Sequence, residues 1–272
     1  MFQMLNYTFM VNALIVGVLT AVCCALLGVV LVLKRYSMIG DGLSHVGFGA
    51  LSVGAALNFG TPVYFAIPVV MICAYLLLRI TENSKINADA AIAVISSSAL
   101  AVGVFVASVN GTNINIQQYM FGSILAVNKN DIMLSIVLFV VVCAIFLLFY
   151  HKIFAITFDE SFSKATGIHT KMFNTAVSLL TAVTVVVGMR MLGTLLISAM
   201  IIFPVLTSMK VCKRFLSVII SSVFVAVFST VSGLWLSFTV ENIPVGATVV
   251  IINLLVFILF SVVSVIKRIM GK

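Results

Sequence analysis

The sequence is dominated by uninterrupted apolar stretches of about 18 to 24 residues, close to the roughly 20 residues that a helix needs to cross a bilayer core of about 30 Å. Of the 272 residues, 63% are hydrophobic and only 8% are charged, which excludes a soluble globular domain. A membrane β-barrel would instead alternate apolar and polar residues in segments of about ten. We therefore predict an all-α polytopic membrane protein.

The apolar stretches predict about nine transmembrane helices, with eight to nine as the range. The second stretch is short, follows a glycine-rich loop, and is expected to begin below the membrane surface. The loops are too short for a second folded domain, so residues 1–272 are expected to form a single transmembrane domain. The nine segments cover about residues 9–33, 43–57, 63–78, 90–109, 132–150, 172–189, 192–209, 215–238 and 245–266.

Three local features refine this expectation. Residues 110–130 are too polar for a span and too apolar for a free linker, and we expect a short helix at the outer surface. Only Arg190 and Met191 separate two spans, so one of those spans is expected to be broken. Ala99, Gly103 and Ala107 share one helix face and predict a close helix contact, which Gly103→Leu would disrupt.

The basic residues predict the orientation. With the N-terminus outside and the C-terminus in the cytoplasm, only Lys129 and Arg190 of the 15 Lys and Arg residues lie outside, which leaves 13 on the cytoplasmic side. The net charge of +8 therefore follows membrane topology and does not indicate nucleic acid. The first basic residue is Lys34, so the first stretch is expected to be a retained span. The five cysteines show no CxxC spacing and are interpreted as small buried hydrophobes.

Asp41 and His45 are a carboxylate and an imidazole in a glycine-rich segment of a chain that otherwise keeps charge out of its apolar stretches. Four positions apart on a helix, the two side chains project from the same face and can share one cation. An ionisable residue inside a membrane is by default a candidate for function. The alternative is that Asp41 caps a helix beginning at Gly42 and that His45 is a hydrogen-bonded core residue, but a cap leaves His45 unexplained.

The polar segment 157–170 is the longest cytoplasmic connection between two spans. An acidic pair opens a short amphipathic helix there, two apolar side chains share one face, and a glycine ends it. A helix of this kind can be gripped by a peripheral motor subunit, although an ordinary solvated connection has the same composition. The residues expected to couple the chain to such a partner are Asp159, Glu160, Phe162, Ala165 and Gly167.

The motifs that the sequence lacks exclude several kinds of chemistry. There is no G-x-x-x-x-G-K-[ST] phosphate loop and no HExxH motif. Of the three histidines, only His45 lies near a span, so no catalytic triad can be assembled. The chain is therefore not expected to be an enzyme or to hold a cofactor. Passage of a substrate through the membrane remains, and any ATP-driven work must come from a partner.

Five motifs in order resemble those of the integral-membrane permease subunit of bacterial ABC importers for zinc, manganese and related divalent metals. Lys34 to His45 resembles R-x-S-x-x-G-D-x-L-x-H, and Tyr119 to Val127 resembles Y-L-F-G-x-x-L-x-V. Phe158 to Gly167 resembles the coupling-helix loop. Gly193 to Pro204 resembles the G-x-x-L-x-x-x-x-x-x-x-P span, and Pro244 to Thr248 a late P-x-G-x-x motif. The resemblance covers nearly the whole chain.

This resemblance implies a type II-like ABC importer permease in the bacterial cell membrane. It implies a homodimer of this chain, two cytoplasmic ATP-binding subunits, and an extracytoplasmic metal-binding protein that delivers the ion. A related alternative is a permease for iron chelates or cobalamin, which needs a wide pathway and no acid and histidine pair. Alternatives from other classes are an ion-coupled secondary transporter and a membrane enzyme. The first would need more intramembrane acids and the second a cluster of His and Asp ligands, and the sequence shows neither.

Asp41 and His45 are the predicted metal ligands, and the ion is the transported substrate. If the pathway lies on a two-fold axis, two carboxylates and two imidazoles surround it. That set suits zinc without water, and with added water it suits manganese or iron(II). The glycine- and phenylalanine-containing run after His45 resembles the zinc members of the family, so zinc is favoured over manganese.

Overall fold

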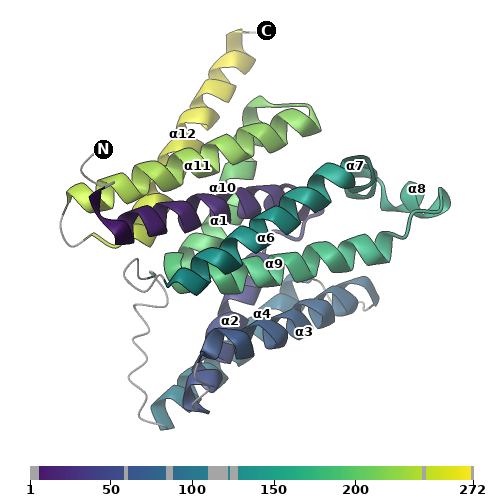
Figure 1. Ribbon diagram of the computed structural model, residues 1–272. Helices are drawn as coiled ribbons and strands as arrows, with labels where there is room; N and C mark the ends of the chain where they lie inside the picture. Colours follow the sequence, from purple (N-terminus) through teal and green to yellow (C-terminus); the bar gives the residue numbers. More distant parts are fainter. Residues whose placement is uncertain are drawn as a thin grey trace.

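The computed structural model describes residues 6–57, 61–83, 88–109, 122, 128–240 and 243–270, and every long element in these ranges is an α-helix. Figure 1 shows the helices as a single bundle. In chain order they are α1 (Thr8–Leu33), α2 (Ile39–Ala56), α3 (Pro62–Asn83), α4 (Ala88–Val109), α6 (Lys129–Leu148), α7 (Tyr150–Phe158), α8 (Glu160–Ala165), α9 (Thr170–Leu192), α10 (Thr194–Val211), α11 (Phe215–Thr239) and α12 (Val245–Met270).

Eight of the described helices are long and apolar enough to cross a membrane: α1, α3, α4, α6, α9, α10, α11 and α12. The remaining predicted segment, 43–57, corresponds to α2, which has 18 residues and carries Asp41, His45 and five glycines. Most of α2 is nevertheless buried against its neighbours. The prediction of an all-α polytopic protein with eight to nine spans is therefore confirmed.

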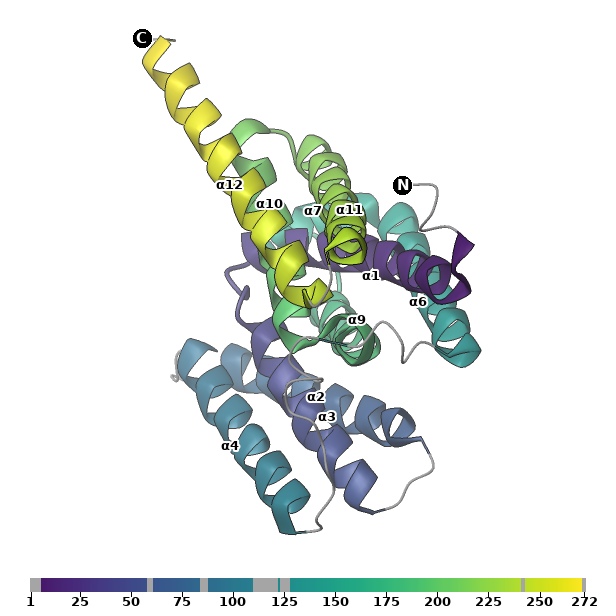
Figure 2. The same cartoon turned by 90° about the vertical axis from the view of Figure 1, so that its left-hand side faces the viewer.

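Helix α1 lies at the centre of the bundle, where it contacts α6, α9, α10 and α11. Helices α2, α3 and α4 gather on one side, as Figure 2 shows from a second direction, and α2 also reaches α9 and α10. Helix α12 packs on α10 and α11, and its C-terminal end projects away from the other helices. Helix α2 is therefore the element that joins the α3 and α4 side to the centre.

The contact between α2 and α4 is the one that the small-residue face of α4 predicts. A Cβ atom added to Gly103 would lie 2.7 Å from the Cα atom of Gly49, and one added to Gly49 would lie 2.4 Å from the carbonyl oxygen of Ala99. Two helices approach this closely only where neither has a side chain at the crossing point. The predicted packing face is thus confirmed.

The connection between α9 and α10 differs from the expectation. Both helices are continuous, and Gly193 alone separates them with a positive φ of 87°, which an L side chain rarely adopts. Neither span is broken, because one glycine absorbs the whole change of direction. The surface helix expected at 110–130 and the motif at 119–127 lie largely outside the described residues.

Candidate metal site and coupling helix

Asp41 and His45 lie on the same face of α2, one turn apart. Asp41 Oδ2 is 3.8 Å from His45 Nε2, and the two side chains are 41% and 34% exposed. Gly40 packs against Ile201, which is near the middle of α10, so the beginning of α2 is level with the middle of that span. A carboxylate and an imidazole therefore sit side by side and partly uncovered at the depth of the transmembrane helices.

The helix-cap explanation for Asp41 is wrong. Helix α2 begins at Ile39, its N-cap residue is Met38, and no side chain caps it. Asp41 lies inside the first turn, where the helix dipole favours a negative charge. Its Oδ1 atom accepts a hydrogen bond of 2.9 Å from the hydroxyl of Ser198, and Oδ2 faces His45. The carboxylate is thus held by another helix and not by the backbone of its own.

Ser198 is the residue of this site that the sequence does not reveal. It lies on α10, 157 positions from Asp41, and its hydroxyl also lies 3.1 Å from the carbonyl of Thr194. The hydroxyl proton of Ser198 can be donated to only one of these two acceptors at a time. The hydroxyl oxygen is the donor in both cases, so its lone pairs are available to another partner. Serine is common in apolar spans, and nothing in the sequence around Ser198 marks it as a partner of Asp41.

The described residues hold no group of three or more His, Cys, Asp or Glu side chains that could bind a metal ion. In the described part of one chain, Asp41 and His45 are therefore a pair without a third side chain of these types close enough to share a metal ion. Closed metal sites in proteins use four or more ligands. A pair of ligands with open positions on the metal binds an ion transiently, which is what transport requires.

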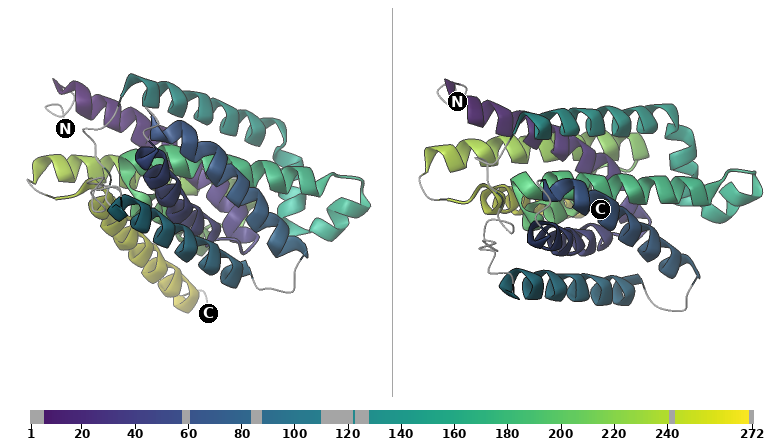
Figure 3. Two further views of the ribbon diagram at one scale, coloured as in Figure 1. Left: turned by 90° about the horizontal axis from the view of Figure 1, so that it is seen from below. Right: turned by 60° about the horizontal axis from the view of Figure 1, so that its bottom comes forward.

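Helix α8 forms where the coupling helix was predicted. The carboxylate of Asp159 accepts a 2.8 Å hydrogen bond from the N–H of Phe162, and Gly167, with a φ of 83°, ends the segment. Phe162 is 63% exposed and Ala165 is exposed as well. Figure 3 shows α8 projecting beyond the ends of the long helices. The helix and its exposed apolar face are confirmed, and docking of a partner on that face stays a prediction.

Glu160, by contrast, is turned toward the bundle. Its carboxylate lies 3.2 Å from Nζ of Lys34 and 2.8 Å from Nζ of Lys164. Partial burial alone would raise the pKa of Glu160, but the hydrogen bonds and charges of Lys164, Lys34 and Asn174 outweigh burial and lower the pKa to about 2. Glu160 therefore holds α8 in place, and its carboxylate is already engaged within this chain.

A second ion pair lies at the opposite end of the bundle. Arg190 at the end of α9 donates a 2.8 Å hydrogen bond to Asp131, whose other oxygen accepts from the N–H of Asn128 at the beginning of α6. Asp131 thus caps its own helix and neutralises Arg190. The pair ties α6 to α9 at the end far from α8.

Eight described helices that are long and apolar enough to span a membrane define a multi-pass membrane protein, which carries a partly exposed carboxylate and imidazole pair on α2 and a short projecting helix, α8. The chain belongs to the ABC 3 transport family, whose model matches residues 6–264.

Curated relatives agree with this family. The manganese transport system membrane protein MntC of Halalkalibacterium halodurans is 27% identical over 262 residues, which cover 94% of this chain and 88% of the relative. The chelated iron transport system membrane protein YfeC of Yersinia pestis is 28% identical over 258 residues, covering 94% of this chain and 86% of the relative. These relatives confirm the predicted class: a multi-pass permease of metal ABC importers in the bacterial cell membrane.

The fold agrees as well. The solved structure described as PsaBC from Streptococcus pneumoniae in complex with Fab contains a chain that matches with a TM-score of 0.83 and 26% sequence identity. The match covers 94% of this chain and 92% of that chain. The described helices are therefore arranged like those of that chain.

Proposed function

We propose that this chain forms the pathway by which an ABC importer moves a divalent transition-metal ion into the cytoplasm, with Asp41 and His45 as the ligands that hold the ion in transit. The observation that carries this proposal is the 3.8 Å approach of a half-exposed carboxylate and imidazole on one face of α2. Within the described residues, the carboxylate of Asp41 accepts one hydrogen bond, from Ser198, and its second oxygen faces His45. Both bind metals in their deprotonated states.

Two copies of the chain complete the site. A carboxylate and an imidazole that are 41% and 34% exposed on a membrane helix need protein or water over them, because exposure to hydrocarbon is costly. A two-fold axis beside α2 supplies each ligand twice and gives two carboxylates and two imidazoles. The other partners proposed are two cytoplasmic ATP-binding subunits and an extracytoplasmic metal-binding protein, since the chain has no phosphate loop of its own.

The identity of the ion follows from the ligand set and the relatives. The run after His45 favours zinc, whereas the printed names of the relatives state manganese and chelated iron. With the hydroxyl of Ser198 beside Asp41 and room for water, the set becomes richer in oxygen, which suits Mn²⁺ or Fe²⁺ better than a closed tetrahedral zinc site. We therefore propose Mn²⁺ as the first ion to test, with Zn²⁺ beside it.

The test is metal-dependent ATP hydrolysis and uptake by the complex reconstituted in proteoliposomes. Mn²⁺, Zn²⁺ and Fe²⁺ are compared for the wild type, Asp41→Ser and His45→Ala, with His151→Ala as an exposed control outside the spans. We expect stimulation by one of the ions, its loss in both site variants with basal hydrolysis retained, and no loss in the control. Wild-type uptake by both site variants would refute the metal assignment.

We further propose that α8 docks into the ATP-binding subunit through Phe162 and Ala165. Phe162→Asp would place a charge in that contact, where burying it costs several kcal/mol, and is expected to abolish co-purification of the ATP-binding subunit. Met172→Asp is the matched control, because Met172 is equally exposed, at 62%, but lies in the first turn of α9. Equal co-purification of both variants with the partner would contradict this docking mode.

A further inference from the structure

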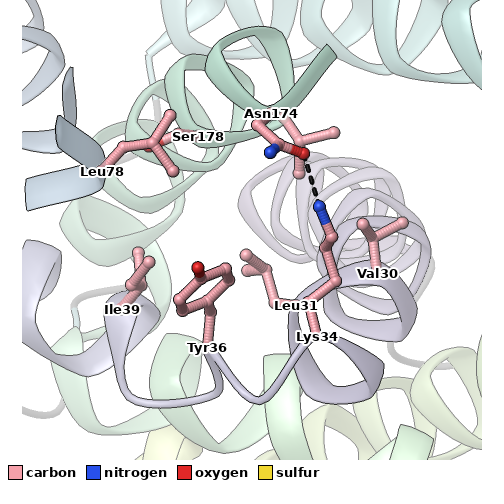
Figure 4. A pocket seen from close by; sticks show the side chains of 9 residues that line it. Val30, Leu31, Lys34, Tyr36, Ile39, Leu78, Asn174 and Ser178 are labelled. Atoms are coloured by element: carbon pink, nitrogen blue, oxygen red, sulfur yellow. Dashed lines mark hydrogen bonds between the residues drawn. The ribbon is translucent and has the colours of Figure 1, made fainter. Parts of the chain in front are cut away.

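Lys34, the residue that ends α1, is buried in an ionic contact with the coupling helix. Its side chain is only 9% exposed, and Nζ lies 3.2 Å from Oε2 of Glu160 and 2.5 Å from Oδ1 of Asn174. Figure 4 shows the Lys34 side chain pointing at Asn174 across a pocket that Tyr36 also lines. An ammonium group this deeply buried requires a counter-charge within its own structure.

Asn174 extends the contact to a third region of the chain. Its Nδ2 group lies 3.3 Å from Oε1 of Glu82 and 3.4 Å from Oε2 of Glu160. Glu82 in turn lies 3.4 Å from Arg79 of its own helix. Four elements, α1, α3, α8 and α9, therefore meet in one network, which we call the Lys34 node; its residues are Lys34, Glu82, Glu160 and Asn174.

In this node, the positive charge of Lys34 is balanced by the carboxylate of Glu160. Burial lowers the pKa of Lys34, and the charge of Glu160 opposes that effect. Lys164, the second cation on Glu160, is 54% exposed and can exchange Glu160 for water at little cost. Of the two lysines on Glu160, Lys34 is the one that cannot lose its partner without being stranded away from solvent.

Lys34 is also the first residue of the connection between α1 and α2, the helix that carries Asp41 and His45. Residues 34–38 join α1 to α2, Arg35 adopts a positive φ of 63°, and Tyr36 returns its N–H to the carbonyl of Leu31. Tyr36 and Ile39 line the small pocket that Lys34 also lines. Asp41 follows Lys34 by seven residues. The connection is short and conformationally defined, so we expect it to move as a unit.

We infer that Lys34 is a positioning residue that joins the coupling helix α8 to the metal helix α2. Through Glu160 it is held by α8, and through residues 34–38 it sets the place of Ile39 and hence of Asp41. A displacement of α8 then moves the metal ligands without any need for a rearrangement of the long spans. This inference rests on the proposed function for its consequence, but the tether itself can be tested without transport.

The first experiment measures amide hydrogen exchange in α8 and in residues 34–38 of the purified full-length chain in lipid nanodiscs. Lys34→Met and Glu160→Gln are each expected to speed exchange at least tenfold in both segments. The double variant is expected to be no faster than the single ones, because both remove the same interaction. Lys164→Met is the control and should change exchange less than twofold. Independent, additive effects of Lys34→Met and Glu160→Gln would overturn the tether.

The second experiment measures the number of metal ions transported per ATP hydrolysed by the reconstituted complex. Lys34→Met is expected to lower this ratio at least fivefold, while basal hydrolysis stays within twofold. A merely structural role would lower hydrolysis and uptake in proportion, and that result would overturn the inference. If the wild-type complex takes up no metal, the proposed function fails, whereas the exchange result still decides whether α8 is tied to α1.

Discussion

The two charged centres near the beginning of α2 are built in opposite ways. Asp41 and His45 approach each other at 3.8 Å, are more than a third exposed on average, and receive from the rest of the described chain only the hydroxyl of Ser198. The Lys34 node is closed, with an ammonium that is 9% exposed between Glu160 and Asn174. Both centres lie within a few residues of the same connection.

The difference separates two uses of charge in a membrane protein. A polar group that finds its partners within the chain contributes to one fixed arrangement, because any alternative leaves a charge unpaired. A polar group that lacks partners within the chain contributes little to the fold and is available to bind a ligand. The first kind should therefore be sensitive in stability and the second kind in transport, and the following variants separate the two.

The largest effect is expected from Asp41→Ala and His45→Ala. Each should lower metal uptake by at least about 100-fold, since loss of even an outer-shell group costs 10-fold to 100-fold in metal sites. Each should leave the unfolding free energy within about 0.5 kcal/mol of the wild type, because neither group is enclosed by the fold. Uptake assays and thermal unfolding of the same preparations check both parts, and a large stability loss would assign the pair a structural role.

Gly103→Leu should come next, because it displaces α2 without touching either charged centre. The new side chain would meet the backbone of Gly49, and such overpacking costs about 1 to 3 kcal/mol. Thermal unfolding and uptake should both decline. Val102→Leu, one residue away and 53% exposed, is the matched control and should behave as the wild type. Normal uptake by Gly103→Leu would mean that α2 and α4 can separate without consequence.

Ser198→Ala should have an intermediate effect on transport and almost none on stability. Removing the hydroxyl frees the carboxylate of Asp41 to rotate, so the metal concentration for half-maximal uptake should rise by about 10-fold. Ser198→Thr keeps the hydroxyl and should recover most of the affinity. If the alanine variant matches the wild type and the threonine variant does not, steric fit and not hydrogen bonding governs this position.

The pH dependence of stability should report the closed centre. The pKa of Glu160 is lowered from its ordinary value of 4.5 to about 2, so its contribution is complete above about pH 4.5 and is lost as the pH falls toward 2. The difference in unfolding free energy between the wild type and Glu160→Gln should therefore shrink over that window. A difference that stays constant from pH 5 to pH 3 would show that the carboxylate is not held as an anion.

The smallest effect belongs to Lys164→Ala. Lys164 is 54% exposed and pairs with Glu160 four residues earlier on the same short helix. Exposed pairs at this spacing contribute about 0.3 to 0.5 kcal/mol. Hydrogen exchange in α8 should change by less than about threefold, and a much larger change would place the main anchor of Glu160 on Lys164 instead of Lys34.

The sequence was sufficient for the parts of this molecule that depend on local patterns. Stretches of apolar residues located the spans, because the bilayer sets their length. The spacing of Asp41 and His45 put both on one face of α2, and the acidic pair with a following glycine located α8. The expectation that one of the spans α9 and α10 is broken was wrong, since the pattern does not show that Gly193 alone can make the turn.

The contacts that organise the site join residues far apart in the chain, and for that reason they could not be read from it. Lys34 and Glu160 are 126 positions apart, Lys34 and Asn174 are 140 apart, and Ser198 is 157 from Asp41. In the sequence, Asn174 is one polar residue in a span and Glu160 looks like a docking residue. Only the packing of α1, α3, α8 and α9 shows that both side chains form hydrogen bonds within this chain.

Gly193, the single residue between α9 and α10, also fixes how one helix is rotated about its axis relative to the other. Arg190 at one side of Gly193 meets Asp131, and Ser198 at the other side meets Asp41, so both helices are held in register from a common point. Each residue inserted or removed between positions 193 and 198 would rotate everything that follows by about 100°, which turns the Ser198 hydroxyl away from α2. Length variation during evolution should therefore be absent from this short interval.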